Sequence, residues 1–141
     1  VMALHTRQVL GVVLGPRLSQ GLALAALEMA LREGCPEVHH SDRGVQYTSR
    51  AYVERLLGLG VRLSYAGTGR PWENGHAERL IRTIKEEWVA LREYRTLAEA
   101  RASVKAFVLE VYDRKRPHSA LGYLTPEAFS ESLWKGGGSP D

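Results

Sequence analysis

The chain has 141 residues, of which 44% are hydrophobic and 25% charged, and its formal net charge is +3. This length suits one domain with one core, and the composition is that of a globular protein rather than a disordered one. The single cysteine, Cys35, excludes an intramolecular disulfide and a CxxC zinc or redox motif. No apolar run approaches the roughly 18 residues of a membrane span and no leader segment is recognisable, so we expect a cytoplasmic protein without membrane contact.

The basic residues are unevenly distributed. From Val1 to Glu78, eight Lys and Arg residues accompany seven Asp and Glu residues, whereas from Arg79 to His118 the numbers are ten and six. Such an excess attracts a polyanion such as DNA, although a charged run is more often simply a solvated helix face.

The first half of the chain predicts strands and one helix. Two apolar runs, Val1–Leu4 and Val9–Leu14, are typical of a hairpin. A chain that opens inside a strand suggests that a segment upstream is missing. Ser19 is a suitable cap for a helix that ends at Gly34. Val38–Ser41 then predicts a short buried strand, with Asp42 at its C-terminal end, where ligand-binding residues gather in open α/β sheets.

The middle of the chain predicts three more helices and a strand. A helix follows Ser49, a strand spans Val61–Tyr65, and a further helix runs from residues 72–74 to about Leu91. The next helix begins after Thr96, has the capping-box residue Glu99, and passes Val111. This order predicts a mixed sheet with helices packed on it.

The C-terminal part combines a basic turn with a return to the core. Arg114-Lys115-Arg116-Pro117-His118 forms the turn, and Leu121, Tyr123 and Phe129 are expected to rejoin the core. We expect residues 1–130 to form the folded domain and residues 131–141, which include a Gly-Gly-Gly-Ser-Pro run, to form a flexible tail.

Asp42 and Glu78 are the candidate catalytic residues. Phosphodiester transfer needs a hard divalent cation, and oxygen ligands suit Mg²⁺ or Mn²⁺. A two-metal site usually needs at least three carboxylates, so two acids form only part of one, and each acid alone also fits an ordinary surface charge. On a helix, Arg82 and Lys85 share the face of Glu78, where they would hold phosphates beside the metal.

Three segments together resemble the catalytic core of insertion-sequence transposases related to retroviral integrases, over about residues 1–130. They are His40-Ser41-Asp42-Arg43-Gly44-x-Gln46-Tyr47, Asn74-Gly75-x-Ala77-Glu78 and Arg116-Pro117-His118-Ser119-Ala120-Leu121-Gly122-Tyr123-x-Thr125-Pro126. The 35 residues between Asp42 and Glu78 also match the interval in that family.

The resemblance implies an α/β, RNase H-like fold, with a mixed sheet and flanking helices, and a DDE site for DNA transposition. Asp42 and Glu78 match its second and third acids and would bind Mg²⁺ or Mn²⁺. The implied partners are transposon-end and target DNA. The expected DNA contacts are Arg79, Arg82, Lys85, Arg114, Lys115 and Arg116. Three further residues, Gln46, Tyr47 and Asn74, either shape the site or serve the structure.

The first acid of the family has no counterpart in this sequence. In the family it lies on the central first strand, whereas the only acids before Asp42 are Glu28, Glu33 and Glu37, in or just after the first predicted helix. We therefore expect a core that lacks its first strand and is inactive or nearly so. The gap would expose unpaired backbone groups, which a partner chain or swapped segment would fill in a homo-oligomer.

Other functions are weighed against this one. His39 and His40 suggest a zinc site, but adjacent strand residues point to opposite faces. Ser41 lacks the surroundings of a serine nucleophile. Two alternatives stay open: a non-catalytic module that binds DNA and self-associates, and an RNase H-like nuclease.

Overall fold

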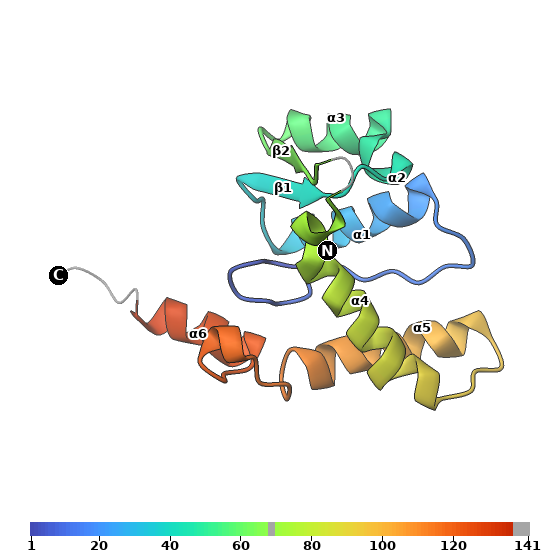
Figure 1. The fold of residues 1–141 in the computed structure, drawn as a ribbon, viewed down its shortest axis with the longest axis vertical. Helices are drawn as coiled ribbons and strands as arrows, with labels where there is room; N and C mark the ends of the chain where they lie inside the picture. Colours follow the sequence, from blue (N-terminus) through green and yellow to red (C-terminus); the bar gives the residue numbers. More distant parts are fainter. Residues whose placement is uncertain (68–69, 137–141) are drawn as a thin grey trace.

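The structure is a computed structural model that describes residues 1–67 and 70–136, except for the side chains at positions 71, 72 and 136. Figure 1 shows helices α1, α2 and α3 gathered with two strands at one end, and α4, α5 and α6 towards the other. In order, the helices and strands are α1 (Gln20–Glu33), β1 (Val38–Ser41), α2 (Val45–Thr48), α3 (Arg50–Gly58), β2 (Arg62–Tyr65), α4 (Gly75–Glu87), α5 (Leu97–Ala106) and α6 (Pro126–Gly136). Short 3-10 turns form η1 (Pro71–Asn74), η2 (Val89–Leu91) and η4 (Ser119–Leu121), and a π-helix forms η3 (Phe107–Tyr112).

Helix α1 forms where the sequence predicts it. The Ser19 hydroxyl accepts a hydrogen bond from the backbone N–H of Leu22 at 3.1 Å, which satisfies one of the free donors of the first turn. The helix ends at Glu33, and Gly34 follows with a positive φ of 157°.

The described sheet is smaller than predicted. Strands β1 and β2 run parallel, with Val38 opposite Arg62 and Ser41 opposite Tyr65. The expected N-terminal hairpin is present only as a single antiparallel bridge between Met2 and Val9, flanked by regular backbone hydrogen bonds. The observed helices and parallel strands agree with the predicted α/β class.

Two buried clusters hold the chain together. The first joins α1 and α3 to the start of β2, through Ala23, Leu27, Tyr52, Leu56 and Val61. The second joins the N-terminal segment to α4, α5 and η3, through Val9, Leu80, Val104, Phe107, Val108 and Tyr112. Helix α4 thus begins near the sheet and runs diagonally towards α5 (Figure 1), and its Leu80 packs in the second cluster.

Helix α4 is shorter than the sequence predicts. It ends at Glu87 rather than near Leu91, and η2 follows Trp88. The Trp88 ring stacks on Phe107, with centroids 4.9 Å apart, and its indole N–H donates to the Ser103 hydroxyl at 2.8 Å. These contacts with α5 and η3 favour a break that no local sequence signal marks.

The capping box of α5 is confirmed. The Thr96 hydroxyl accepts from the backbone N–H of Glu99 at 3.1 Å, and the Glu99 carboxylate accepts from the N–H of Arg95 at 2.9 Å. The predicted continuation past Val111 is also present, but as the wider turns of η3.

At the C-terminal end one core prediction is wrong. Leu121 is buried, but Tyr123 is 76% exposed because it follows Gly122 in a second left-handed residue and so points away from the cluster. Helix α6 includes residues 131–136, the first part of the expected tail, and residues 137–141 lie outside the described chain. Within the described residues no helix has the length and apolar character needed to cross a membrane.

Candidate functional site

Asp42 lies directly after β1 in a tight turn. Its Oδ1 atom accepts from the backbone N–H of Gly44 at 2.7 Å, and the residue is half-buried. A Cβ atom at position 44 would lie 2.9 Å from this oxygen and 2.8 Å from Nε2 of Gln46. A side chain at position 44 would therefore displace one or both of these groups, and the Asp42 carboxylate and the buried Gln46 amide both lie beside Gly44.

Glu78 lies in the first turn of α4 and is exposed. Its carboxylate forms no hydrogen bond or ion pair with the residues that the structure describes. The positive end of the helix dipole favours a carboxylate here. Glu78 is therefore available to an external ligand.

His40 connects the two elements that carry these acids. Its Nε2 atom lies 2.8 Å from the backbone carbonyl of Glu73 in η1, and its Nδ1 atom lies 2.9 Å from the Ser64 hydroxyl on β2. Since a carbonyl only accepts, Nε2 donates, and a neutral imidazole then accepts from Ser64 at Nδ1. This link holds the end of β1, just before Asp42, against the entry to α4, just before Glu78.

The sequence suggested His40 as a possible metal ligand and as part of the first family motif, but it did not predict this connecting role. His39 bonds elsewhere, to the Tyr52 hydroxyl at 2.9 Å, so the two imidazoles do not converge. The described residues contain no group of three or more potential metal ligands among His, Cys, Asp and Glu. The only sign in the sequence that His40 has a hydrogen-bond partner on a neighbouring element was its position as a polar residue inside a short strand.

Three of the predicted DNA-contacting residues lie exposed on α4. Arg82 and Lys85 follow Glu78 on one helix face, and Arg79 lies beside it. Within residues 1–67 and 70–136, none of the three forms an ion pair. Their charges are therefore available to phosphates.

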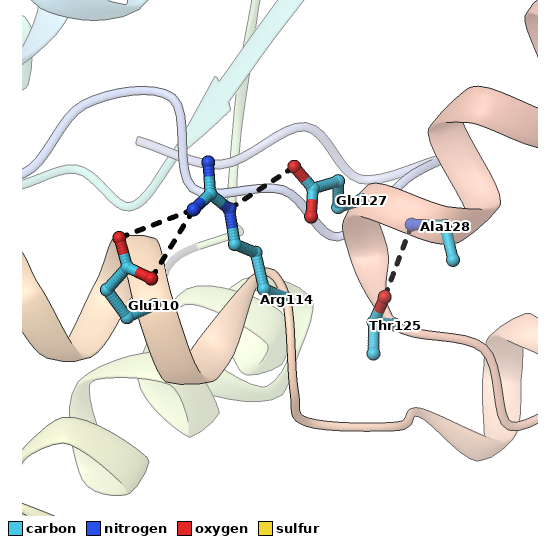
Figure 2. Close-up of polar contacts among 5 residues, drawn as sticks. All are labelled: Glu110, Arg114, Thr125, Glu127 and Ala128. Atoms are coloured by element: carbon cyan, nitrogen blue, oxygen red, sulfur yellow. Dashed lines mark hydrogen bonds and ion pairs between the residues drawn. The ribbon is translucent and has the colours of Figure 1, made fainter.

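The basic turn after η3 is partly neutralised. Figure 2 shows the Arg114 guanidinium between two carboxylates, with Glu110 and Glu127 each 3.3 Å away. Arg116 pairs with Glu87 of α4. Lys115 is exposed and forms no ion pair among the described residues. Of this run, only Lys115 is available without breaking a contact.

Tyr47 packs in a buried cluster, whereas Asn74 lies at the entry to α4. The Tyr47 ring packs edge-on against Tyr52, with centroids 5.5 Å apart, in the α1–α3 cluster. Burial raises the pKa of Tyr52 well above its ordinary value, so this cluster keeps a neutral phenol. Asn74 precedes α4, but its side chain makes no capping hydrogen bond.

Comparison with known proteins shows which family the sequence resembles. Two family models, both described as an integrase core domain, match the chain, one over residues 1–71 and one over residues 59–126. The chain is 34% identical over 132 residues to the transposase InsF for insertion sequence IS3A of Escherichia coli K12, covering 92% of this chain and 46% of that protein.

Two other relatives give a similar result. The transposase for insertion sequence element IS904 of Lactococcus lactis is 29% identical over 129 residues, covering 89% of this chain and 51% of that protein. An uncharacterized 31 kDa protein of insertion element IS600 of Shigella sonnei is 32% identical over 130 residues, covering 90% and 48%. The chain thus spans about half the length of these curated relatives. Because the first match alone covers half of its residues, the chain belongs to the integrase core domain family.

Proposed function

We propose that this chain is part of the catalytic core of a DNA transposase, which joins and cuts phosphodiester bonds with the help of a divalent cation. The observation that carries the proposal is the His40–Glu73 hydrogen bond, because it fixes the strand of Asp42 against the helix of Glu78. The transposases among its relatives support DNA as the substrate.

Asp42 and Glu78 are the proposed ligands of Mg²⁺ or Mn²⁺. Both offer carboxylate oxygens, the donors these ions prefer, and the hydrogen bond from Gly44 leaves the second oxygen of Asp42 without a partner among the described residues. When bound, the cation would polarise the phosphate and lower the pKa of the attacking hydroxyl. The pair supplies part of a ligand set, and we propose that a third carboxylate comes from outside the printed sequence.

Glu28 of the first helix is not the third ligand that we propose. Glu28 of α1 is held by Arg55 of α3, with Oε1 2.5 Å from Nε, and the ion pair lowers the pKa of Glu28. We propose that the chain by itself is inactive or nearly so. The RNase H-like sheet of the family would then be completed by a strand beside β1, whose described pairing is with β2 alone.

Arg82 and Lys85 are the proposed phosphate contacts beside the metal. They lie four and seven residues beyond Glu78, hence on its face of α4, and they are exposed. Arg79 and Lys115 extend this cationic surface, whereas Arg114 and Arg116 would need to leave their carboxylates to join it. DNA bound there would present a phosphate to the two acids.

Metal binding tests the site directly. Titration of the chain with Mn²⁺, followed by electron paramagnetic resonance, should show weak binding that Asp42→Asn and Glu78→Gln each reduce at least fivefold. Glu86→Gln is the matched control, because Glu86 is an exposed acid of the same helix that lies about two turns beyond Glu78. Equal binding by all four proteins would contradict the assignment.

Catalysis is tested in a longer protein that contains this chain and the proposed third acid. A strand-transfer assay with Mn²⁺ should lose activity in Glu78→Gln and keep it in Glu86→Gln. Activity that survives Glu78→Gln would remove Glu78 from the mechanism.

We also propose that the chain self-associates through the free side of its small sheet, where backbone groups of β1 would otherwise lack partners. Analytical ultracentrifugation should show a dimer whose dissociation depends on concentration. A strictly monomeric, folded chain would rule out this mode of association.

A further inference from the structure

A cavity of about 250 Å³ lies between the N-terminal segment, α4 and the turn before η4. Its lining includes three arginines from distant parts of the sequence: Arg7, Arg79 and Arg116. His76, Thr83 and His118 also line it, and no carboxylate of the described residues does. The folded chain therefore gathers cations that are far apart in sequence around one open cavity.

The arginines are only partly neutralised. Arg116 pairs with Glu87, whereas Arg7 donates to the Leu4 carbonyl at 2.5 Å and Arg79 forms no ion pair within the described chain. Burial, followed by the charges of Arg7 and Arg79, lowers the pKa of His76. Burial, followed by the charges of Arg116 and Arg7, likewise lowers the pKa of His118. The cavity thus has a positive potential that an anion would relieve.

One polar atom of the cavity wall lacks a partner. The Nε2 atom of His118 is shielded from solvent and makes no hydrogen bond with the described residues. The ring is held in place by edge-on packing with Tyr112, with centroids 5.1 Å apart. Buried polar atoms without partners are uncommon and unfavourable. Because solvent does not reach this nitrogen, His118 forms part of the cavity wall and does not contact a ligand in the cavity.

The backbone at Arg7 adds an independent observation. Arg7 has a φ of 62°, in the left-handed region that disfavours residues with a Cβ atom. Such strain is concentrated at functional positions, where the surrounding structure maintains it. Here the strained residue is the one that brings a guanidinium from the N-terminal segment to α4.

The cavity is separate from the candidate metal site. His76, Leu80 and Thr83 line it with a four- and seven-residue spacing, so they share one face of α4. Glu78, Arg82 and Lys85 share another face, roughly half a turn away at about 3.6 residues per turn. Arg79 lies between the two faces.

We propose that this cavity binds a backbone phosphate of DNA, held by Arg7, by Arg79 and by the N–H groups of Arg116 that its pairing with Glu87 leaves over. Guanidinium groups form paired hydrogen bonds with phosphate oxygens, and three of them from different sides suit a tetrahedral anion. Because Arg79 lies next to the face of Arg82 and Lys85, one DNA backbone can cross α4 and contact both. The inference rests on the proposed function, because it takes DNA as the ligand, but it needs neither Asp42 nor Glu78.

Two binding measurements in EDTA test the proposal, so that metal chemistry cannot contribute. The first follows thermal unfolding with increasing inorganic phosphate at constant ionic strength, set with potassium chloride. The second measures the fluorescence anisotropy of a labelled DNA duplex over a series of salt concentrations. Arg7→Gly removes the guanidinium while permitting the left-handed backbone, and Arg79→Gln changes an exposed residue. Arg32→Gln, at the end of α1, is the matched control for charge.

We expect phosphate to stabilise the parent chain and Arg32→Gln, but not Arg7→Gly or Arg79→Gln. Each of these two variants should weaken DNA binding at least fivefold. Each should also reduce, by about 1, the slope of the logarithm of the binding constant against the logarithm of the salt concentration, as for one lost phosphate contact. The double variant should reduce the slope by about 1 as well, because both arginines hold the same phosphate.

Three results would overturn the proposal. They are equal phosphate stabilisation in all variants, DNA binding that matches the Arg32→Gln control, and a slope that falls by about 2 in the double variant. Phosphate binding that is lost in the variants while DNA binding stays unchanged would assign the cavity to free phosphate and also reject DNA. A failure of the Mn²⁺ titration alone leaves these measurements unaffected.

Discussion

His40 of β1 donates from Nε2 to the backbone carbonyl of Glu73, 2.8 Å away, and so joins the strand before Asp42 to the entry of the helix that carries Glu78. The same imidazole also contacts Ser64 of β2 at 2.9 Å. One side chain therefore connects both strands to α4, and the relative position of the two candidate acids depends on it.

Replacing His40 should affect both stability and metal binding. We expect His40→Ala to lower the free energy of unfolding by about 1–2 kcal/mol, since two hydrogen bonds are lost, and to weaken Mn²⁺ binding. Urea unfolding and the Mn²⁺ titration measure the two effects. His40→Gln, which keeps a donor and an acceptor, is the control and should recover part of both. Unchanged Mn²⁺ affinity in a destabilised His40→Ala would show that the link has no role in the site.

Ser103 should be critical for the junction between α4 and α5. Its hydroxyl accepts from the Trp88 indole N–H at 2.8 Å and lies 2.9 Å from the Tyr94 hydroxyl. Ser103→Ala leaves both groups without this partner, so we expect a loss of about 1–3 kcal/mol in unfolding free energy. Tyr94→Phe removes only one contact and should cost about 1 kcal/mol or less. A larger effect in Tyr94→Phe than in Ser103→Ala would contradict this account.

Gly11 should not tolerate a side chain. A Cβ atom there would lie 2.1 Å from the backbone carbonyl oxygen of Ala26 in α1, so the N-terminal segment would have to move away from the helix. We expect Gly11→Ala to destabilise the chain by about 3 kcal/mol, the upper part of the range for overpacking. Thermal unfolding is the measurement. Gly58→Ala, at the end of α3 with open space around it, is the control and should be neutral or slightly stabilising.

Asp113 should make stability depend on pH. Burial raises its pKa from 3.8 to about 6, although the N–H of Val9, 3.2 Å from Oδ1, opposes the shift. Between these values the folded chain holds a proton that the unfolded chain releases, so this contribution to stability falls as pH rises from about 4 to about 6. Above pH 6 the buried charge remains as a penalty.

Asp113→Asn keeps an acceptor for Val9 without the charge. We expect it to exceed the parent chain in stability by about 1 kcal/mol at pH 7, with allowance for solvent screening, and to match it near pH 4. Urea unfolding at both pH values is the measurement. Asp113→Ala, which lacks the acceptor, should be less stable than Asp113→Asn at both. If Asp113→Asn and the parent chain differed in unfolding free energy by the same amount at pH 4 and at pH 7, the raised pKa of Asp113 would be contradicted.

Local signals in the sequence were sufficient for several elements. The Ser19 cap and the Thr96 cap each depend on hydrogen bonds within a few residues, and each forms as predicted. The spacing of Glu78, Arg82 and Lys85 on one helix face is equally local. These features follow from backbone hydrogen bonding and helix periodicity, which operate at short range.

Contacts between distant segments decided the rest. Stacking of Trp88 on Phe107 ends α4 early, and the carboxylates beside Arg114 neutralise a cation that the sequence presents as free. No local pattern relates Arg7 to Arg116, yet the fold places both at one cavity. The sequence by itself determined the candidate acids and the helix that carries their neighbouring cations. Only the tertiary structure decided which cations remain available and which residues meet, because packing and ion pairing join residues that short-range patterns cannot relate.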